Sequence, residues 1–151
     1  MIYIASDHGG YDLKNEIIKY FKKENIEYED LGTNSKERTD YPIFAKKVCE
    51  KIIENENSNS KGILICKSGH GMTYTANKFK GIRCSLAYSK ESIVHGVEDD
   101  DINVIALSSN DLDKESVIDI VEGFLCSKFK NNERYLERVK MVLNIEKENF
   151  K

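Results

Sequence analysis

One short apolar stretch constrains the fold of this chain more than any other feature. Residues 62–66 read Gly-Ile-Leu-Ile-Cys, without a charged side chain. An uninterrupted apolar run of this length, bounded by glycine, is typical of a central parallel strand that helices cover on both faces. The chain must therefore supply helices for two sides of a sheet.

The remaining sequence alternates strand-like and helix-like segments. Further strands are expected at residues 3–5, 26–30, 82–87 and 103–107. Apolar residues at helical spacing mark residues 13–21, 44–53, 72–78, 91–97, 116–129 and 133–146. This alternation predicts an α/β fold: a Rossmann-like, three-layer α/β/α sandwich with a five-stranded parallel sheet. Without an internal repeat or a linker, residues 1–151 are expected to form a single domain.

Composition excludes several classes of function. The net charge is only −3, and the basic residues are spread among acidic ones, so no nucleic-acid surface is expected. No apolar run approaches the ~20 residues that span a bilayer, and the N-terminus does not resemble a signal peptide. The four cysteines lack CxxC or zinc-site spacing and are interpreted as reduced thiols. We expect a cytoplasmic protein that binds neither nucleic acid nor membrane.

Reactive side chains follow two of the predicted strands. Asp7 and His8 come after the first strand, and the loop 66–71, Cys-Lys-Ser-Gly-His-Gly, comes after the third. In open parallel sheets, ligands bind beyond the carboxyl ends of the strands. These two turns are therefore the places where a functional site is expected.

The loop 66–71 has the chemistry of a proton-transfer site. Gly69 and Gly71 precede a helix, so backbone N–H groups can converge on an anion or a developing oxyanion. The pKa of a thiol at Cys66 is expected to fall below the free value of about 8.5, which suits a base that removes a proton beside a carbonyl. Ser68 could hydrogen-bond a substrate hydroxyl. A buried core cysteine in a tight turn explains the same residues equally well.

Other charged residues also have two interpretations. Asp7 and His8 could contact an anion or transfer protons, or Asp7 could simply cap the next helix. Arg134 and Arg138 share a helix face and could clamp a phosphate, or they could pair with neighbouring glutamates. The acidic run 98–101 could bind a metal but is typical of a solvated loop, so no metal site is assigned.

Several motifs occur in a definite order along the chain. They are Ser-Asp-His-Gly-Gly at 6–10, Leu-Gly-Thr at 31–33, Arg-Thr-Asp-Tyr-Pro at 38–42, the loop at 66–71, Ala-Asn-Lys at 76–78, Gly-Ile-Arg at 81–83, Asn-Val at 103–104 and Arg-x-x-x-Arg-Val at 134–139. Together they resemble the ribose-5-phosphate isomerase type B family, which includes the galactose-6-phosphate isomerase subunits. The resemblance covers nearly the whole chain.

The resemblance implies an aldose–ketose isomerase of the pentose phosphate pathway. Such an enzyme interconverts ribose 5-phosphate and ribulose 5-phosphate through a cis-enediolate, without a cofactor or a metal. It also implies a homodimer or a dimer of dimers, with sites completed across the subunit boundary. The C-terminal helix, about 131–148, is then expected to pack at that boundary.

The resemblance also implies roles for individual residues. Cys66 transfers the proton between C1 and C2, assisted by Ser68, and the backbone of the following loop stabilises the enediolate. The expected substrate contacts are Asp7, His8, Tyr41, Lys67, Gly69, His70, Gly71, Asp100, Arg134 and Arg138. Of these, His8 and the two arginines hold the phosphate.

The chain departs from the family pattern at several positions. Lys67 replaces a glycine, which places a Cβ where an unusual backbone angle could be needed. Ser68 replaces a threonine, and His70 an aliphatic residue or an asparagine. A His-Asn pair usual before the last strand is replaced by Asp99 and Asp100.

The missing histidine can be explained in more than one way. Asp99 could open the sugar ring as the acid and base, or His70 or His95 could occupy the vacant space. Alternatively, the substrate could be a six-carbon aldose 6-phosphate such as allose or galactose 6-phosphate. A non-catalytic sugar-phosphate-binding protein is the third possibility. We rank ribose 5-phosphate first and assign Asp99 as the ring-opening group.

Overall fold

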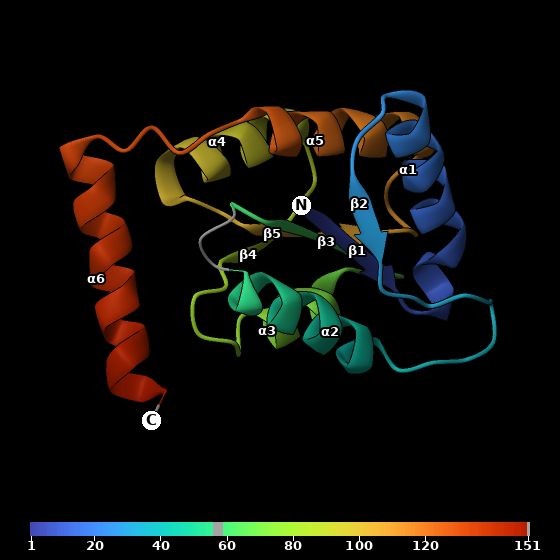
Figure 1. The fold of residues 1–151 in the computed structure, drawn as a ribbon, viewed down its shortest axis with the longest axis horizontal. Coiled ribbons are helices and arrows are strands. Elements are labelled where there is room, and N and C mark those ends of the chain that lie inside the picture. Colours follow the sequence, from blue (N-terminus) through green and yellow to red (C-terminus); the bar gives the residue numbers. More distant parts are fainter. Residues whose placement is uncertain (56–58, 151) are drawn as a thin grey trace.

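The computed structural model describes residues 1–55 and 59–150 (Figure 1). Within them, the strands are β1 (Ile2–Ser6), β2 (Tyr28–Asp30), β3 (Lys61–Cys66), β4 (Cys84–Leu86) and β5 (Val104–Ser108). The helices are the 3-10 turn η1 (His8–Gly10), α1 (Tyr11–Lys23), α2 (Tyr41–Glu54), α3 (His70–Ala76), α4 (Lys90–Asp100), α5 (Lys114–Cys126) and α6 (Glu133–Asn149). The strands pair in parallel in the order β2-β1-β3-β5-β4, which confirms the predicted five-stranded Rossmann-like sandwich.

The apolar run forms the central strand, β3, between β1 and β5. Because side chains alternate along a strand, it contributes to both layers of the core. Ile63 and Ile65 belong to the cluster with α1, α4 and α5, while Leu64 and Cys66 belong to the cluster with α2 and α3. Cys66 therefore lies at the carboxyl end of the central strand, on the side that α2 and α3 cover.

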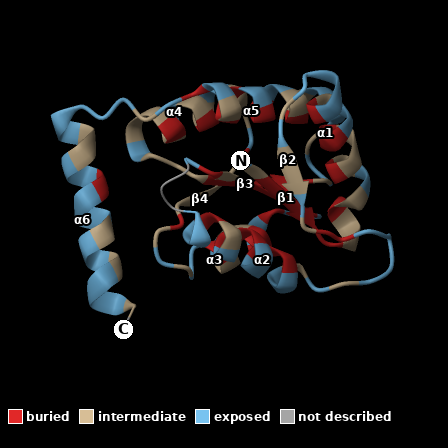
Figure 2. Ribbon diagram, viewed as in Figure 1, coloured by how far each residue is buried: buried red, intermediate tan, exposed pale blue. Residues whose placement is uncertain are grey.

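The two helical layers bury these clusters against the sheet. In Figure 2, buried residues follow the strands and the inward faces of the helices, while the outward faces are exposed. Each fully buried Ile, Leu or Phe contributes roughly 1.5–3 kcal/mol relative to an exposed one. The core thus fixes the strand ends from which the functional turns project.

Some element boundaries differ from those expected. Helix α3 begins at His70, and α5 ends at Cys126 because Ser127 has an extended backbone. Helix α4 does not stop before the acidic run but continues through Asp100. The next residue, Asp101, caps the helix and adopts the left-handed conformation with φ of 55°. The acidic run is therefore mostly helical rather than a solvated loop.

Helix α6 stands apart from the sandwich (Figure 1). Val139 is its one buried residue, whereas Met141, Val142 and Ile145 are 63%, 55% and 58% exposed. Near its end, both carboxylate oxygens of Glu146 accept the N–H of Gly81 at 3.0 Å. The helix is thus anchored to the body but leaves an apolar side uncovered. In the part of the chain described, no helix is long and apolar enough to cross a membrane.

Candidate active site

Asp7 shapes the turn that follows β1. Its Oδ1 accepts the N–H groups of Gly9 at 3.0 Å and Gly10 at 3.1 Å, which is the capping role considered from the sequence. The residue is only 6% exposed. Among residues 1–55 and 59–150, no hydrogen bond reaches its Oδ2, so this oxygen can still accept one from a ligand. The cap and the expected substrate contact are therefore compatible.

His8 is held by a single residue of the segment between β2 and α2. Its backbone N–H donates to Thr39 Oγ1 at 3.0 Å, and its ring Nδ1 lies 3.2 Å from both the N–H and the carbonyl oxygen of Thr39. Unprotonated, Nδ1 accepts from the N–H; protonated, it donates to the carbonyl. In both states the ring keeps its orientation, and Nε2 stays available for a ligand.

The loop after β3 folds back onto the thiol of Cys66. The N–H of Gly69 donates to Cys66 Sγ at 3.1 Å, and the thiol-bearing residue is only 4% exposed. Gly69 has φ of 77°, a conformation that favours glycine. A Cβ there would also lie 2.5 Å from Leu86 Cδ1. Gly69 thus provides both the turn and a donor aimed at the sulfur, where a thiolate is a stronger acceptor than a thiol.

The expected convergence of the loop N–H groups on one point is wrong for two of them. The N–H of Gly69 is directed at Cys66, and the N–H of His70 lies 3.4 Å from Ser68 Oγ. Helix α3 has only seven residues, so its dipole is small. Ser68 and His70 are both exposed at the edge of the loop, where their side chains can meet a ligand.

Lys67 connects this loop with the turn after β1. Its carbonyl oxygen accepts Ser108 Oγ at 2.6 Å and Asn110 N–H at 3.0 Å. Its side chain crosses Gly9, where a Cβ would lie 2.5 Å from Lys67 Cγ. The concern that Lys67 needs an unusual backbone angle is wrong, because the positive φ of this loop falls at Gly69. The exposed ammonium of Lys67 forms no ion pair with any residue described.

Tyr41 covers the other side of the loop. A Cβ on Gly71 would lie 2.6 Å from the ring Cζ of Tyr41, so the close approach requires glycine. The Tyr41 hydroxyl hydrogen-bonds to the hydroxyl of Tyr74, and the two rings meet edge to face with centroids 6.2 Å apart. This hydrogen bond raises the pKa of Tyr41, so the phenol is neutral at physiological pH. Tyr74 was not singled out from the sequence.

One group of predicted residues thus lies at the carboxyl ends of the strands: Asp7, His8, Tyr41 and the loop 66–71. We call them the thiol half-site. It includes Lys67, Ser68, Gly69, His70 and Gly71.

The remaining predicted residues lie at the opposite end of the sheet, where the parallel strands begin. Asp99 and Asp100 end α4 just before β5 begins, whereas Cys66 is paired with the last residue of β5, Ser108. Arg134 and Arg138 lie on α6. The segment just before α6 is held to α4 by a hydrogen bond from the N–H of Lys130 to the carbonyl oxygen of Glu98. We call these four residues the arginine half-site. One chain does not bring the two half-sites together.

Both arginines are available to an anion. They are exposed, and neither forms an ion pair within the described ranges. Glu137 pairs with Lys140 at 3.7 Å instead, so local salt bridges do not account for the arginine pair. His95 is exposed on α4. Within residues 1–55 and 59–150, no three His, Cys, Asp or Glu side chains are grouped so that they could hold a metal.

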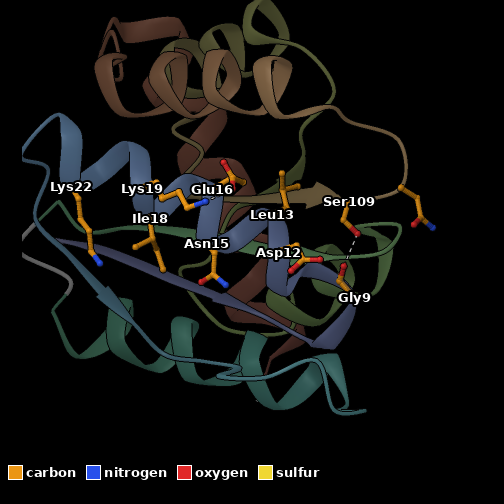
Figure 3. Close-up of a pocket in the computed structure, with 10 residues that line it drawn as sticks. Gly9, Asp12, Leu13, Asn15, Glu16, Ile18, Lys19, Lys22 and Ser109 are labelled. Atoms are coloured by element: carbon orange, nitrogen blue, oxygen red, sulfur yellow. Dashed lines mark hydrogen bonds and ion pairs between the residues drawn. The ribbon is translucent and has the colours of Figure 1, made fainter.

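A groove of about 810 Å³ follows α1 from Gly9 and Ser109 toward Lys22 (Figure 3). At its end Ser109 Oγ donates to the carbonyl oxygen of Gly9 at 2.8 Å. The residues of the thiol half-site do not line it. The groove therefore borders the candidate site without being part of it.

Fold and site together define an α/β protein with a thiol-bearing loop at the carboxyl edge of a parallel sheet. A family model described as Ribose/Galactose Isomerase matches residues 2–142. The chain belongs to this family, as its motifs indicated.

Individual relatives agree with this assignment. The chain is 35% identical to ribose-5-phosphate isomerase B of Escherichia coli over 145 residues, covering 96% of this chain and 95% of the relative. The structure of ribose-5-phosphate isomerase B from Clostridium thermocellum has a TM-score of 0.91 at 37% identity, with 97% of each chain covered. That of the Mycoplasma genitalium enzyme with bound ribulose-5-phosphate also has a TM-score of 0.91, at 36% identity, covering 98% of this chain and 97% of the other.

Proposed function

We propose that this protein interconverts ribose 5-phosphate and ribulose 5-phosphate, with Cys66 as the base. The observation that carries the proposal is the buried thiol at the carboxyl end of β3, which receives the N–H of Gly69 at 3.1 Å beside Asp7, His8 and Tyr41. The M. genitalium relative was solved with ribulose-5-phosphate bound. The reaction belongs to carbohydrate metabolism, in the pentose phosphate pathway.

The chemistry follows from where these groups lie. The Cys66 thiolate removes the C2 proton of the open-chain aldose, and the electron pair forms the C1–C2 double bond of a cis-enediolate. Returning the proton to C1, with transfer of a hydroxyl proton from O2 to O1, gives the ketose. Ser68 is placed to hydrogen-bond the reacting oxygens. General acid–base catalysis of this kind contributes about 10²–10⁴-fold.

We further propose a homodimer, alone or paired into a tetramer, in which the thiol half-site of one chain meets the arginine half-site of its partner. Arg134 and Arg138 would then join His8 around the phosphate, while Asp99 opens the ring and Asp100 contacts the sugar. The exposed apolar side of α6 supports this arrangement, because a partner subunit would cover it. A cytoplasmic location is part of the proposal, since all four cysteines are free thiols.

A second candidate substrate is a six-carbon aldose 6-phosphate, such as allose or galactose 6-phosphate. It is favoured by the carboxylates at Asp99 and Asp100 in place of the His-Asn pair, and by the galactose isomerases within the family description. A non-catalytic sugar-phosphate-binding protein is the remaining alternative.

The test combines a substrate panel with thiol variants. Wild-type protein is assayed on ribose, allose and galactose phosphates in deuterated water, and exchange at C2 is followed by NMR. We expect turnover and C2 exchange with ribose 5-phosphate, both reduced at least about 10³-fold in Cys66→Ala, because the proton acceptor is lost. Cys126→Ala, which removes an exposed thiol of α5, is the matched control and should behave as wild type.

Each contrary result has a definite meaning. Near wild-type turnover in Cys66→Ala would exclude the thiol mechanism. Preference for a hexose phosphate would select the second substrate. Binding without C2 exchange for any sugar would show a non-catalytic protein. An Asp99→Asn variant that retains turnover only on open-chain substrate would confirm ring opening by the carboxylate.

A further inference from the structure

A lysine outside the two half-sites is fully buried. Lys14 of α1 is 1% exposed, and its Nζ donates to Asp30 Oδ1 at 2.6 Å and to the carbonyl oxygen of Thr33 at 2.7 Å. Burying an amine is costly unless it is paired and hydrogen-bonded, and an apolar side chain would fill the same space without that cost. The contacts of Lys14 therefore point to a role in positioning.

Both acceptors lie at the start of the segment 30–41, which joins β2 to α2. Asp30 Oδ1 also accepts the N–H of Gly32 at 3.0 Å. Gly32 and Thr33 in turn pair with the backbone of Ser6, at 2.7 and 2.8 Å. Ser6 is the last residue of β1, directly before Asp7. Lys14 thus fixes the beginning of this segment to the strand end that carries the thiol half-site.

The same segment returns to the site at its far end. Residues 34–38 are exposed, and Thr39 then makes all three contacts that orient His8. Two residues later, the ring of Tyr41 covers Gly71. The segment that Lys14 anchors therefore positions two side chains of the site: Tyr41, at the start of α2, and His8, in the turn after β1.

We propose that Lys14 is a positioning residue: by clamping the segment 30–41 it holds the His8 ring in the orientation that binds the substrate phosphate. The phosphate role of His8 rests on the proposed function, but the orientation of its ring does not. The inference can therefore be tested both without and with the reaction.

The first test is NMR of the histidine rings. The chain has three histidines. His95 is exposed on α4, away from the segment and from the thiol half-site, so it is the internal reference. In Lys14→Met we expect the His8 ring signals to shift or broaden while those of His95 stay unchanged. Lys22→Met, which removes an exposed lysine from the same helix, is the control and should leave all three unchanged.

The second test is kinetic. Lys14→Met should raise the KM for ribose 5-phosphate at least about tenfold with kcat within about twofold, as loss of a ground-state contact does. Thr39→Val, which removes the Oγ1 acceptor at constant size, should act in the same direction. The double variant should raise KM by less than the product of the two effects, because both act through His8.

Specific results would overturn the proposal. They are a folded Lys14→Met with unchanged His8 signals, or effects of Lys14 and Thr39 that multiply independently. If Lys14→Met does not fold, Asp30→Ala decides, because its side chain is 29% exposed and it removes the same clamp; Glu29→Ala is its control. If wild-type protein does not isomerise ribose 5-phosphate, the proposed function fails, while the His8 signals still decide the role of Lys14.

Discussion

Contacts made possible by glycine set how closely the parts of the thiol half-site approach one another. Gly71 lets the Tyr41 ring lie against the loop, and Gly69 turns the loop so that its N–H reaches Cys66. Tyr41 is in turn fixed by Tyr74. At the scale of residues, the contacts of Tyr41 and Cys66 therefore depend on neighbouring glycines, which have no side chain to block them.

Gly71→Ala should therefore impair the reaction without unfolding the protein. The new Cβ would lie 2.6–2.9 Å from three ring carbons of Tyr41, below the ~3.5–4.0 Å of carbon contacts, so Tyr41 must move. Alanine is otherwise favoured within a helix by about 1 kcal/mol. We expect kcat/KM for ribose 5-phosphate to fall at least about tenfold, measured with thermal unfolding as the check on folding.

A second background tests the cause. In Tyr41→Ala protein, adding Gly71→Ala should have little further effect, since the ring it displaces is gone. A Gly71→Ala variant with full activity would show that the Tyr41 position is unimportant for the reaction.

Part of the thiol half-site was predicted from the rule that the ends of parallel strands meet at one end of the sheet, whereas Tyr41 was expected only from the resemblance to the family. Asp7, His8 and Cys66 follow from that rule. The roles of Tyr74, Thr39 and Lys14 do not follow from it, because these residues act through partners that are 33, 31 and 16 positions away in the sequence. No local pattern marks such pairs. The resemblance implied sites completed across a subunit boundary, but which residues lie apart within one chain became clear only when α6 and the end of α4 were placed.

At the scale of elements, helices were predicted well where apolar periodicity was strong and less well where charges ended it. The acidic run 98–101 resembled a loop, yet α4 continues until Asp101 takes the left-handed conformation. Charged residues also join helices of one layer. Glu16 of α1 lies 2.5 Å from Lys114 of α5 and 2.7 Å from Lys19.

Glu16 makes the packing of α1 against α5 sensitive to acid. Hydrogen bonds to Lys114 and Lys19 lower its pKa from 4.5 to about 2. Since the folded-state pKa lies below the unfolded one, its stabilisation is present above pH 4.5 and is lost as pH falls toward 2. Urea unfolding at pH 7, 4.5 and 3 should show a smaller loss on acidification in Glu16→Gln than in wild type.

The exposed Glu27, which has no ion pair among the residues described, supplies the comparison. Glu27→Gln should follow the wild-type curve. If the free energy of unfolding falls equally with pH in wild type and Glu16→Gln, the ion pair of Glu16 with Lys114 does not contribute to the acid sensitivity.

At the scale of the molecule, the proposed dimer predicts that activity requires two chains, because the two half-sites lie at opposite ends of the strands of one sheet. This can be tested by mixing two impaired proteins and assaying them at a ribose 5-phosphate concentration far below the KM of Arg138→Ala. Cys66→Ala and Arg138→Ala chains, unfolded and refolded together, should regain about a quarter of wild-type activity, because half of the dimers are mixed and one of their two sites is intact. Each variant refolded alone is the control.

Activity that does not recover, although mixed dimers are demonstrated by mass, would place Cys66 and Arg138 in the same site of one chain. Recovery would equally exclude a monomeric enzyme.

The contact between Gly9 and Lys67 has a consequence for how sequences of this family can vary. A Cβ at position 9 and the Cγ of Lys67 would occupy one volume, 2.5 Å apart. That volume can hold a side chain from position 9 or the side chain of residue 67, but not both. In relatives with glycine at the position of Lys67, we expect a side chain to be accepted at position 9, and in relatives with lysine there we expect glycine at position 9. The two positions, 58 residues apart in the printed sequence, are thus predicted to vary together.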